Sequence, residues 1–227
     1  MNQVSILDCT LRDGGYINNW RFGKETIRGI IEKLNASGVE IVECGFLRDV
    51  PYDRDVSVFS DTSQIAPFLP EKRANTLYVA MIAYGDISPD AVEPYDGSSI
   101  GGIRLTFHKH EWDEAKTVAV QLMEKGYQVF IQPVGTTAYS DAELLRLIAQ
   151  VNELQPYAFY LVDTLGILYR QDLLRLFYLV EHNLDPQIQI GFHSHNNLQL
   201  SFANAQELLR LDSKRDIIID ASVYGMG

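Results

Sequence analysis

Eight short apolar segments, rich in β-branched residues, recur along the chain and constrain its fold more than any other feature. They occupy residues 4–7, 39–42, 77–80, 103–105, 129–131, 159–162, 188–190 and 217–219. Helical patterns separate many of them, which implies strand–helix units joined by right-handed crossovers between parallel strands. Eight such units predict closure into a (β/α)8 barrel, the TIM barrel. An open doubly wound sheet is the alternative, but no Gly-x-Gly-x-x-Gly motif follows the first segment.

Helical periodicity is clearest after the fifth predicted strand. Ser140 and Glu143 have capping-box spacing, and the apolar residues that follow them recur every three or four positions. Similar patterns occur at residues 27–34, 112–126 and 173–180. The stretch 46–60 has no helical period and carries many charges, so we expect a long loop on the catalytic face of the barrel. Such a loop either covers the substrate or is an ordinary solvated segment.

Composition narrows the kinds of partner that the chain can bind. A length of 227 residues fits one barrel domain. The net charge of −11 argues against binding to nucleic acid or to an anionic membrane, since both need clustered Lys and Arg. There is no apolar stretch long enough to span a bilayer and no leader pattern, so we expect a cytoplasmic protein with a small-molecule partner. Cys9 and Cys44 lie in or beside predicted strands, and we expect both to be reduced core thiols.

Two histidines follow the seventh predicted strand, at the rim where barrel enzymes place their catalytic groups. His193 and His195 are two residues apart, so on an extended chain both imidazoles face the same way and can converge on one metal ion. A polar pair at a strand end is an equally good explanation of these two residues alone. Arg12 and Asp13 follow the first predicted strand at the same rim, where a third ligand and a cation can be supplied.

Three motifs together resemble the DRE-TIM metallolyases, the HMGL-like family. They are Asp-Cys-Thr-Leu-Arg-Asp-Gly at 8–14, Gly-Phe-His-Ser-His-Asn-Asn-Leu at 191–198 and Asp-Ala-Ser-Val-Tyr-Gly-Met-Gly at 220–227. The family includes 4-hydroxy-2-oxovalerate aldolase, hydroxymethylglutaryl-CoA lyase and the isopropylmalate and homocitrate synthases. The resemblance runs from the first to the last predicted strand and implies one catalytic barrel domain over residues 1–227.

The resemblance implies a role for each residue that matches a family motif. Asp13, His193 and His195 would hold a divalent ion, Mn2+ or Mg2+, with Zn2+ also compatible with nitrogen ligands. Arg12 would steady an enolate. Glu43, after the second strand, and the pair Asp163 and Thr164, after the sixth, match supporting positions near the substrate. We therefore expect these last three residues to help bind it.

The chain departs from the family pattern where a proton must move. The hydroxy-oxovalerate aldolases have a histidine three residues after the metal aspartate, whereas this chain has Tyr16. A phenol is a poor base unless its surroundings lower its pKa, so Tyr16 is either a catalytic group or an aromatic wall of the site. His108, at the end of the fourth strand, is a second candidate acid or base, or else an exposed loop histidine.

The activity that this resemblance implies is cleavage or formation of a carbon–carbon bond next to a 2-oxo acid through an enolate, as in 4-hydroxy-2-oxo acid aldolases. The alternatives are a Claisen-type condensation that depends on an acyl-CoA, a metal-dependent hydrolase, and a degenerate barrel that only binds. In barrel hydrolases, however, a His-x-His pair normally ends strand one. The sequence ends directly after the eighth strand, so we expect the barrel to lack its last helix and any C-terminal domain. Uncovered apolar surface then favours a homo-oligomer.

Overall fold

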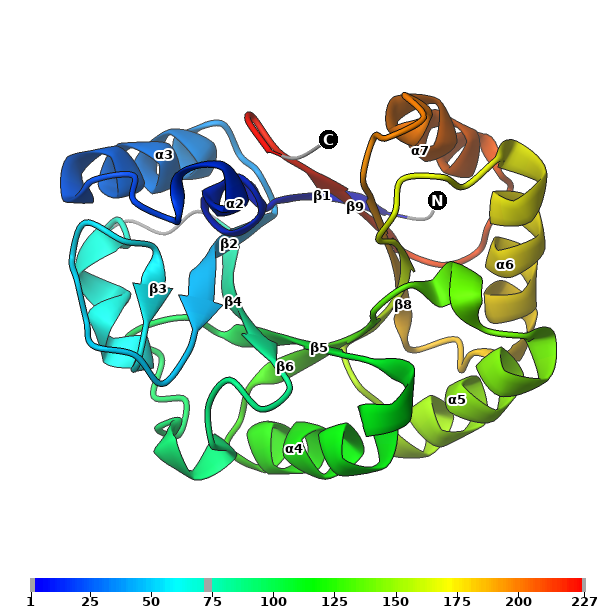
Figure 1. The fold of residues 1–227 in the computed structure, drawn as a ribbon, viewed down its shortest axis with the longest axis horizontal. Helices are drawn as coiled ribbons and strands as arrows, with labels where there is room; N and C mark the ends of the chain where they lie inside the picture. Colours follow the sequence, from blue (N-terminus) through cyan, green and yellow to red (C-terminus); the bar gives the residue numbers. More distant parts are fainter. Residues whose placement is uncertain (1–2, 72–74, 226–227) are drawn as a thin grey trace.

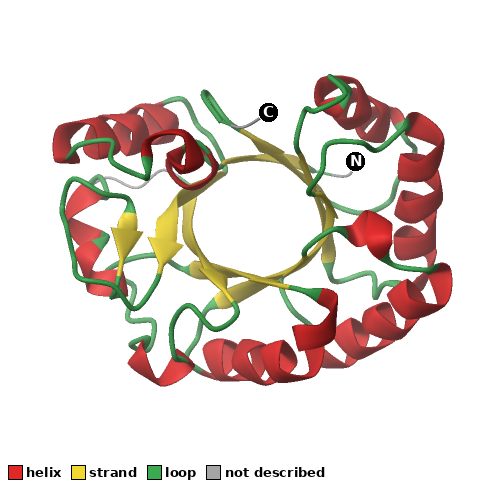
Figure 2. Ribbon diagram, in the orientation of Figure 1, coloured by secondary structure: helices red, strands yellow, loops and turns green. Residues whose placement is uncertain are grey.

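The structure, a computed structural model that describes residues 3–71 and 75–225, is a closed parallel barrel with helices around it (Figures 1 and 2). The barrel strands are β1 (Val4–Asp8), β2 (Ile41–Leu47), β4 (Leu77–Ala83), β5 (Gly102–Phe107), β6 (Gln128–Pro133), β7 (Ala158–Asp163), β8 (Gln189–Ser194) and β9 (Ile217–Ala221). Each pairs in parallel with the next, and β1 closes the ring by pairing with both β9 and β2. All eight predicted strands and the TIM-barrel prediction are confirmed.

Seven α-helices occur in the described residues, and the five longer ones lie outside the barrel (Figure 1). They are α1 (Thr10–Asp13), α2 (Gly15–Asn18), α3 (Lys24–Ala36), α4 (Trp112–Glu124), α5 (Asp141–Leu154), α6 (Arg170–Asn183) and α7 (Ser201–Arg210). The predicted capping box begins α5, because the Ser140 hydroxyl accepts a hydrogen bond from the Glu143 amide and the Glu143 carboxylate accepts one from the Ser140 amide. Short 3-10 helices take the place of α-helices after β2 and β4.

The segment at 46–60 is not wholly a loop, and to that extent its prediction was wrong. Phe46 and Leu47 are buried and complete β2. The two-residue strand β3 (Val58–Phe59) then pairs with them in parallel, outside the barrel ring. The period-two pattern is too short here to be distinguished from a charged loop. Pairing with β3 fixes the end of β2 and the direction in which the chain leaves the barrel.

Alternate strand residues face two different cores. In β7, Phe159 and Leu161 belong to the large cluster shared with the helices, whereas Ala158, Tyr160 and Val162 belong to a second cluster inside the barrel. Cys9 and Cys44 are buried and lie in separate core clusters, as expected of core thiols. Across the parts of the chain that the structure describes, there is no helix both long and apolar enough to cross a bilayer.

Candidate metal centre and active site

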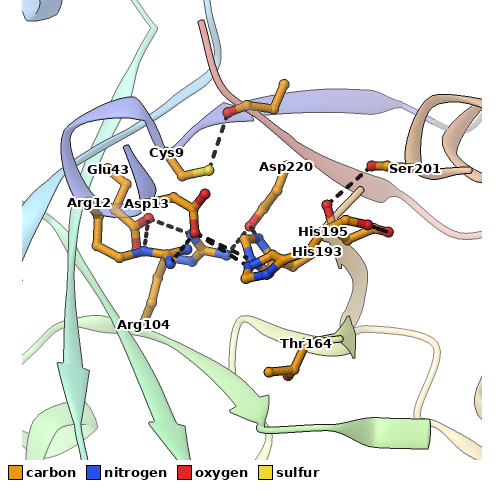
Figure 3. A network of polar contacts seen from close by, with 12 residues as sticks. Cys9, Arg12, Asp13, Glu43, Arg104, Thr164, His193, His195, Ser201 and Asp220 are labelled. Carbon is orange, nitrogen blue, oxygen red and sulfur yellow. Dashed lines mark hydrogen bonds and ion pairs between the residues drawn. The ribbon is translucent and has the colours of Figure 1, made fainter. Parts of the chain in front are cut away.

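Asp13, His193 and His195 meet at the rim formed by the carboxyl ends of the barrel strands (Figure 3). The Asp13 carboxylate oxygen Oδ1 lies 3.5 Å from Nε2 of His195 and 4.0 Å from Nε2 of His193. One ion with bonds of about 2.0–2.2 Å can reach ligand atoms at such separations. The predicted trio thus comes together in space, with one carboxylate and two imidazole donors that suit a divalent ion.

The strand pattern explains why the two imidazoles converge. In β8, Ile190 and Phe192 pack in the outer core, so the alternation points His193 into the barrel. His195 lies just beyond the strand end, and its ring centroid is 5.2 Å from that of His193. Burial lowers the pKa of His193, which keeps this imidazole neutral and able to bind a metal.

Asp220, on β9, fixes the orientation of His193. Its Oδ2 lies 2.8 Å from Nδ1 of His193 and also forms an ion pair with Arg104. Burial raises the pKa of Asp220, but the charge of Arg104 and the bond to His193 outweigh it and hold that pKa below its ordinary value. An ionised Asp220 can only accept, so the proton lies on Nδ1 of His193 and Nε2 offers its lone pair toward Asp13.

Arg12 lies beside the trio and is held by two carboxylates. Its Nε donates to Glu43 at 2.9 Å and its Nη1 donates to Asp13 at 2.9 Å. Among the described residues, its Nη2 is buried without a hydrogen-bond partner. A buried donor of this kind is costly unless a ligand satisfies it, so it marks the place where an anionic oxygen would bind.

The carboxylate of Asp13 stays ionised despite its burial. Burial raises its pKa, but the bond to His195 and the charge of Arg12 outweigh that effect and hold the pKa well below its ordinary value. A second cluster of potential ligands, Cys9 with His193 and Asp220, fits a metal less well. Burial raises the pKa of the Cys9 thiol and keeps it neutral, and Oδ2 of Asp220 already bonds to Nδ1 of His193 and pairs with Arg104.

The site opens into a cavity of about 440 Å3 at the barrel mouth. Predicted residues that line it are Arg12, Tyr16, His108, Thr164, His193 and His195. Tyr16 packs edge-on against Trp20 and Phe46, with ring centroids 4.9 and 6.3 Å away. His108 is exposed and begins a short 3-10 turn, with its backbone amide bound to Glu111. Thr164 accepts a hydrogen bond from the Gly135 amide with its hydroxyl oxygen.

Two of the predicted substrate-binding residues are not among the residues that line the cavity. Glu43 is fully buried inside the barrel, where its carboxylate bridges Arg12 and Arg104. Asp163 is buried and accepts hydrogen bonds from the amides of Ile167 and Leu168. Both residues therefore have a structural role in supporting the site. Direct contact of either with substrate stays a prediction.

The loop after β7 positions the loop that carries His195. The Asp163 carbonyl accepts a hydrogen bond from the His195 amide at 3.2 Å, and the Gly166 carbonyl accepts one from the Leu198 amide at 2.9 Å. Gly166 has a φ of +62°, and a Cβ there would lie within 2.7 Å of the His195 carbonyl oxygen. Only glycine allows this approach without strain.

Sequence reasoning missed two buried groups, Arg104 and Asp220. Arg104 interrupts the apolar β5 and faces the barrel interior, where it is fully buried against Glu43, Asp220 and the Tyr160 ring. Its position in the middle of a strand was a signal that a buried partner exists. Asp220 lies in the third motif, whose last two residues, Met226 and Gly227, fall outside the described residues.

Comparison with known proteins identifies the family. The family model described as HMGL-like matches residues 103–227, more than half of the chain. The chain belongs to the HMGL-like family. Among curated relatives of this HMGL-like chain, an oxaloacetate decarboxylase from Mycobacterium tuberculosis is 25% identical over 98% of the chain and 65% of the relative. A 4-hydroxy-2-oxovalerate aldolase from Geobacillus genomosp. 3 is 24% identical over 99% of the chain and 66% of the relative.

This HMGL-like chain thus spans about two thirds of the length of these relatives. Solved structures with the same fold include the HMG-CoA lyase of Bacillus subtilis, at a TM-score of 0.75 and 16% identity over 100% of the chain and 79% of that structure. The carboxyl transferase domain of Rhizobium etli pyruvate carboxylase has a TM-score of 0.75 at 14% identity, over 98% of the chain and 40% of that structure. These likenesses support the barrel fold.

Proposed function

We propose that this protein is a divalent-metal-dependent lyase that cleaves, or in reverse forms, a carbon–carbon bond next to a 2-oxo acid. The observation that carries the proposal is the convergence of Asp13, His193 and His195 beside the buried, unsatisfied Nη2 of Arg12. Membership in the HMGL-like family and relatives named as aldolases and a decarboxylase support it. Retro-aldol cleavage of a 4-hydroxy-2-oxo acid is the reaction that we favour.

In this proposal Asp13, His193 and His195 hold the ion, which is Mn2+ or Mg2+, with Zn2+ also compatible. When bound, a divalent ion polarises the carbonyl of the 2-oxo acid as a Lewis acid. The imidazole of His193 is kept in the required tautomer by Asp220, and the backbone of Asp163 positions His195. The buried ion pairs keep these side chains fixed before substrate arrives.

Arg12 would act on the oxygen at which negative charge develops. When the bond between C3 and C4 breaks, its electron pair forms a double bond between C2 and C3, and the π pair of the C2 carbonyl moves onto its oxygen to give an enolate. At the same time the C4 hydroxyl loses its proton and becomes an aldehyde carbonyl. Nη2 of Arg12 is a donor held in place by Glu43 and Asp13, so it stabilises that oxygen with little reorganisation. Protonation of C3 then yields pyruvate.

The proton from the C4 hydroxyl needs an acceptor at the cavity wall. His108 and Tyr16 both line the cavity. An imidazole accepts a proton near neutral pH more readily than a phenol does, so we assign this step to His108 first and to Tyr16 second. Tyr16 also forms part of the aromatic wall with Trp20 and Phe46.

Decarboxylation is a second candidate reaction, because Tyr16 stands where the aldolases have a histidine. Loss of CO2 from a 3-carboxy-2-oxo acid leaves the same enolate and requires no base to take a hydroxyl proton. The oxaloacetate decarboxylase relative agrees with this alternative. Condensation with an acyl-CoA is a third reaction that the same groups can serve.

An activity assay with Mn2+ separates these reactions. We expect pyruvate release from 4-hydroxy-2-oxo acids, or from oxaloacetate if decarboxylation is the reaction, and loss of the activity in EDTA. Turnover that requires acetyl-CoA would point to condensation. No turnover with any of the three substrates, despite tight Mn2+ binding, would reduce the barrel to a binding module and refute the proposed lyase.

Asp220→Asn is expected to weaken Mn2+ binding about 10–100-fold, the usual cost of losing a partner that orients a ligating histidine. The amide keeps the shape of the side chain but loses the charge that holds the proton on Nδ1 of His193. Calorimetric titration with Mn2+ measures the effect, and Asp212→Asn, on the loop before β9, serves as a control. An unchanged Mn2+ affinity would show that Asp220 does not tune the ligand.

A further inference from the structure

The cavity presents cationic and donor groups, although the protein as a whole is acidic. Its lining includes Arg12, Arg48, His108, His193 and His195. Among the described residues that line it there is no Asp or Glu, in a chain whose net charge is −11. A cavity of this kind suits an anionic ligand. Arg12 and the two ligating histidines account for one anionic end of a 2-oxo acid, but Arg48 has no role in the proposed reaction.

Arg48 is held rigidly at the end of β2. Its backbone amide donates to the Phe59 carbonyl at 2.8 Å, across the short pairing between β2 and β3. Its guanidinium carbon lies 4.0 Å from the centroid of the Phe46 ring and 5.0 Å from that of Trp20. Its Nε donates to Asp86 at 2.6 Å. A stacked and anchored guanidinium loses little side-chain entropy when it binds a carboxylate.

The bond to Asp86 leaves the two Nη groups of the Arg48 guanidinium available to a ligand. The bond to Asp86 uses Nε, and in the described part of the chain the two Nη groups of Arg48 donate no hydrogen bond. The Arg48 side chain is 26% exposed and Asp86 is 31% exposed, so neither is sealed in the core. Asp86 partly neutralises the charge of Arg48, but it does not line the cavity. Two parallel N–H donors suit a carboxylate.

Arg48 and the two histidines of the metal trio line the same cavity from different sides of the barrel. The histidines end β8, whereas Arg48 follows β2, and these strands lie on opposite sides of the ring in Figure 1. Arg12, after β1, lies between them in the strand order. A ligand whose 2-oxo acid end meets the trio and Arg12 would therefore direct its other end toward Arg48.

We propose that the substrate carries a second carboxylate at the end away from its 2-oxo acid group, and that Arg48 binds it. The inference rests on the proposed function, because it takes the metal trio as the site of the 2-oxo acid. Arg48 is then a specificity-determining residue that selects dicarboxylic over monocarboxylic 2-oxo acids. The aromatic wall of Phe46 and Trp20 contributes by holding the guanidinium.

Matched pairs of ligands test this inference. 2-Oxoglutarate and 2-oxopentanoate have equal chain lengths and differ only in that a distal carboxylate replaces a methyl group, as do 2-oxoadipate and 2-oxohexanoate. Calorimetric titration with Mn2+ present is expected to show that the wild type binds at least one dicarboxylate about 10–100-fold more tightly than its partner, the usual range for one charge-assisted pair. In Arg48→Met, which keeps an apolar stem on Phe46, the preference should disappear while the Kd of the monocarboxylates and of Mn2+ stay unchanged.

Two further variants define the control. Arg175→Met removes an exposed arginine of α6 that pairs with Asp141 away from the cavity, and it should keep the full preference. Arg48→Lys keeps the charge without the planar fork and should give an intermediate preference. Equal binding of both members of each pair by the wild type, or a preference that survives in Arg48→Met, would overturn the inference. Failure of the wild type to bind Mn2+ would instead refute the metal-dependent function, and the same pairs titrated without Mn2+ would still decide the role of Arg48.

Discussion

Replacing His193 and His195 together by alanine is expected to weaken Mn2+ binding by more than about 100-fold. Loss of a partner that only orients a ligand costs about 10–100-fold, and this variant removes two ligands outright. Asp13 would remain as a single carboxylate that Arg12 already neutralises in part. A lone carboxylate paired with a guanidinium is a weak site for a divalent ion.

The measurement is a titration with Mn2+, followed by calorimetry or by the electron paramagnetic resonance signal of the free ion. His182→Ala is the matched control, because His182 is an exposed histidine of α6 whose ring binds the Tyr178 carbonyl. It should leave the Kd for Mn2+ unchanged. Equal affinity in the wild type and in the double variant would rule out the assignment of these two ligands.

Arg12→Lys is expected to lower kcat by about 10²–10³, the usual cost of losing one preorganised donor to a developing oxyanion. Lysine keeps the positive charge between Glu43 and Asp13, so these two buried carboxylates are not left uncompensated. Its three donors share one nitrogen, however, so they cannot reproduce the positions that the guanidinium spreads over three nitrogens. The loss should therefore appear in kcat more than in KM.

Steady-state kinetics with the substrate identified in the Mn2+ assay measure this effect. The Kd for Mn2+ of Arg12→Lys, measured in parallel, shows whether the metal site survives, and we expect a small change. Arg175→Lys provides the control for a distant arginine. A kcat equal to that of the wild type would exclude Arg12 from the stabilisation of the enolate.

Most of the strands could be predicted from the sequence because their apolar runs are buried on both faces, which distinguishes them from the amphipathic helices. Helix α7 could not, since Phe202 is 75% exposed while Asn204 is buried and donates to the Leu168 carbonyl. An exposed aromatic and a buried amide obscure the helical pattern of apolar residues. The extra strand β3 has only two residues and has no pattern of its own.

The convergence of His193 and His195 could be predicted because their spacing and their position at a strand end determine where the side chains point. Asp13 was added to them only by the family resemblance. The partners that support them could not be predicted, because they depend on contacts across the barrel. Asp220 reaches His193 from the neighbouring strand, and Arg104 joins Glu43 to Asp220 through the interior. Asp163 shows the same limit, since its motif predicts proximity to the site but not that its carboxylate binds the loop backbone.

A structure of the protein with Mn2+ and pyruvate tests the central claim most directly. Anomalous scattering locates the manganese independently of the protein chain. We predict one manganese peak within bonding distance of Asp13, His193 and His195, with the carboxylate and carbonyl oxygens of pyruvate completing its coordination and Arg12 bonded to the carbonyl oxygen. Manganese bound elsewhere, or at these residues with pyruvate outside the cavity, would contradict the account.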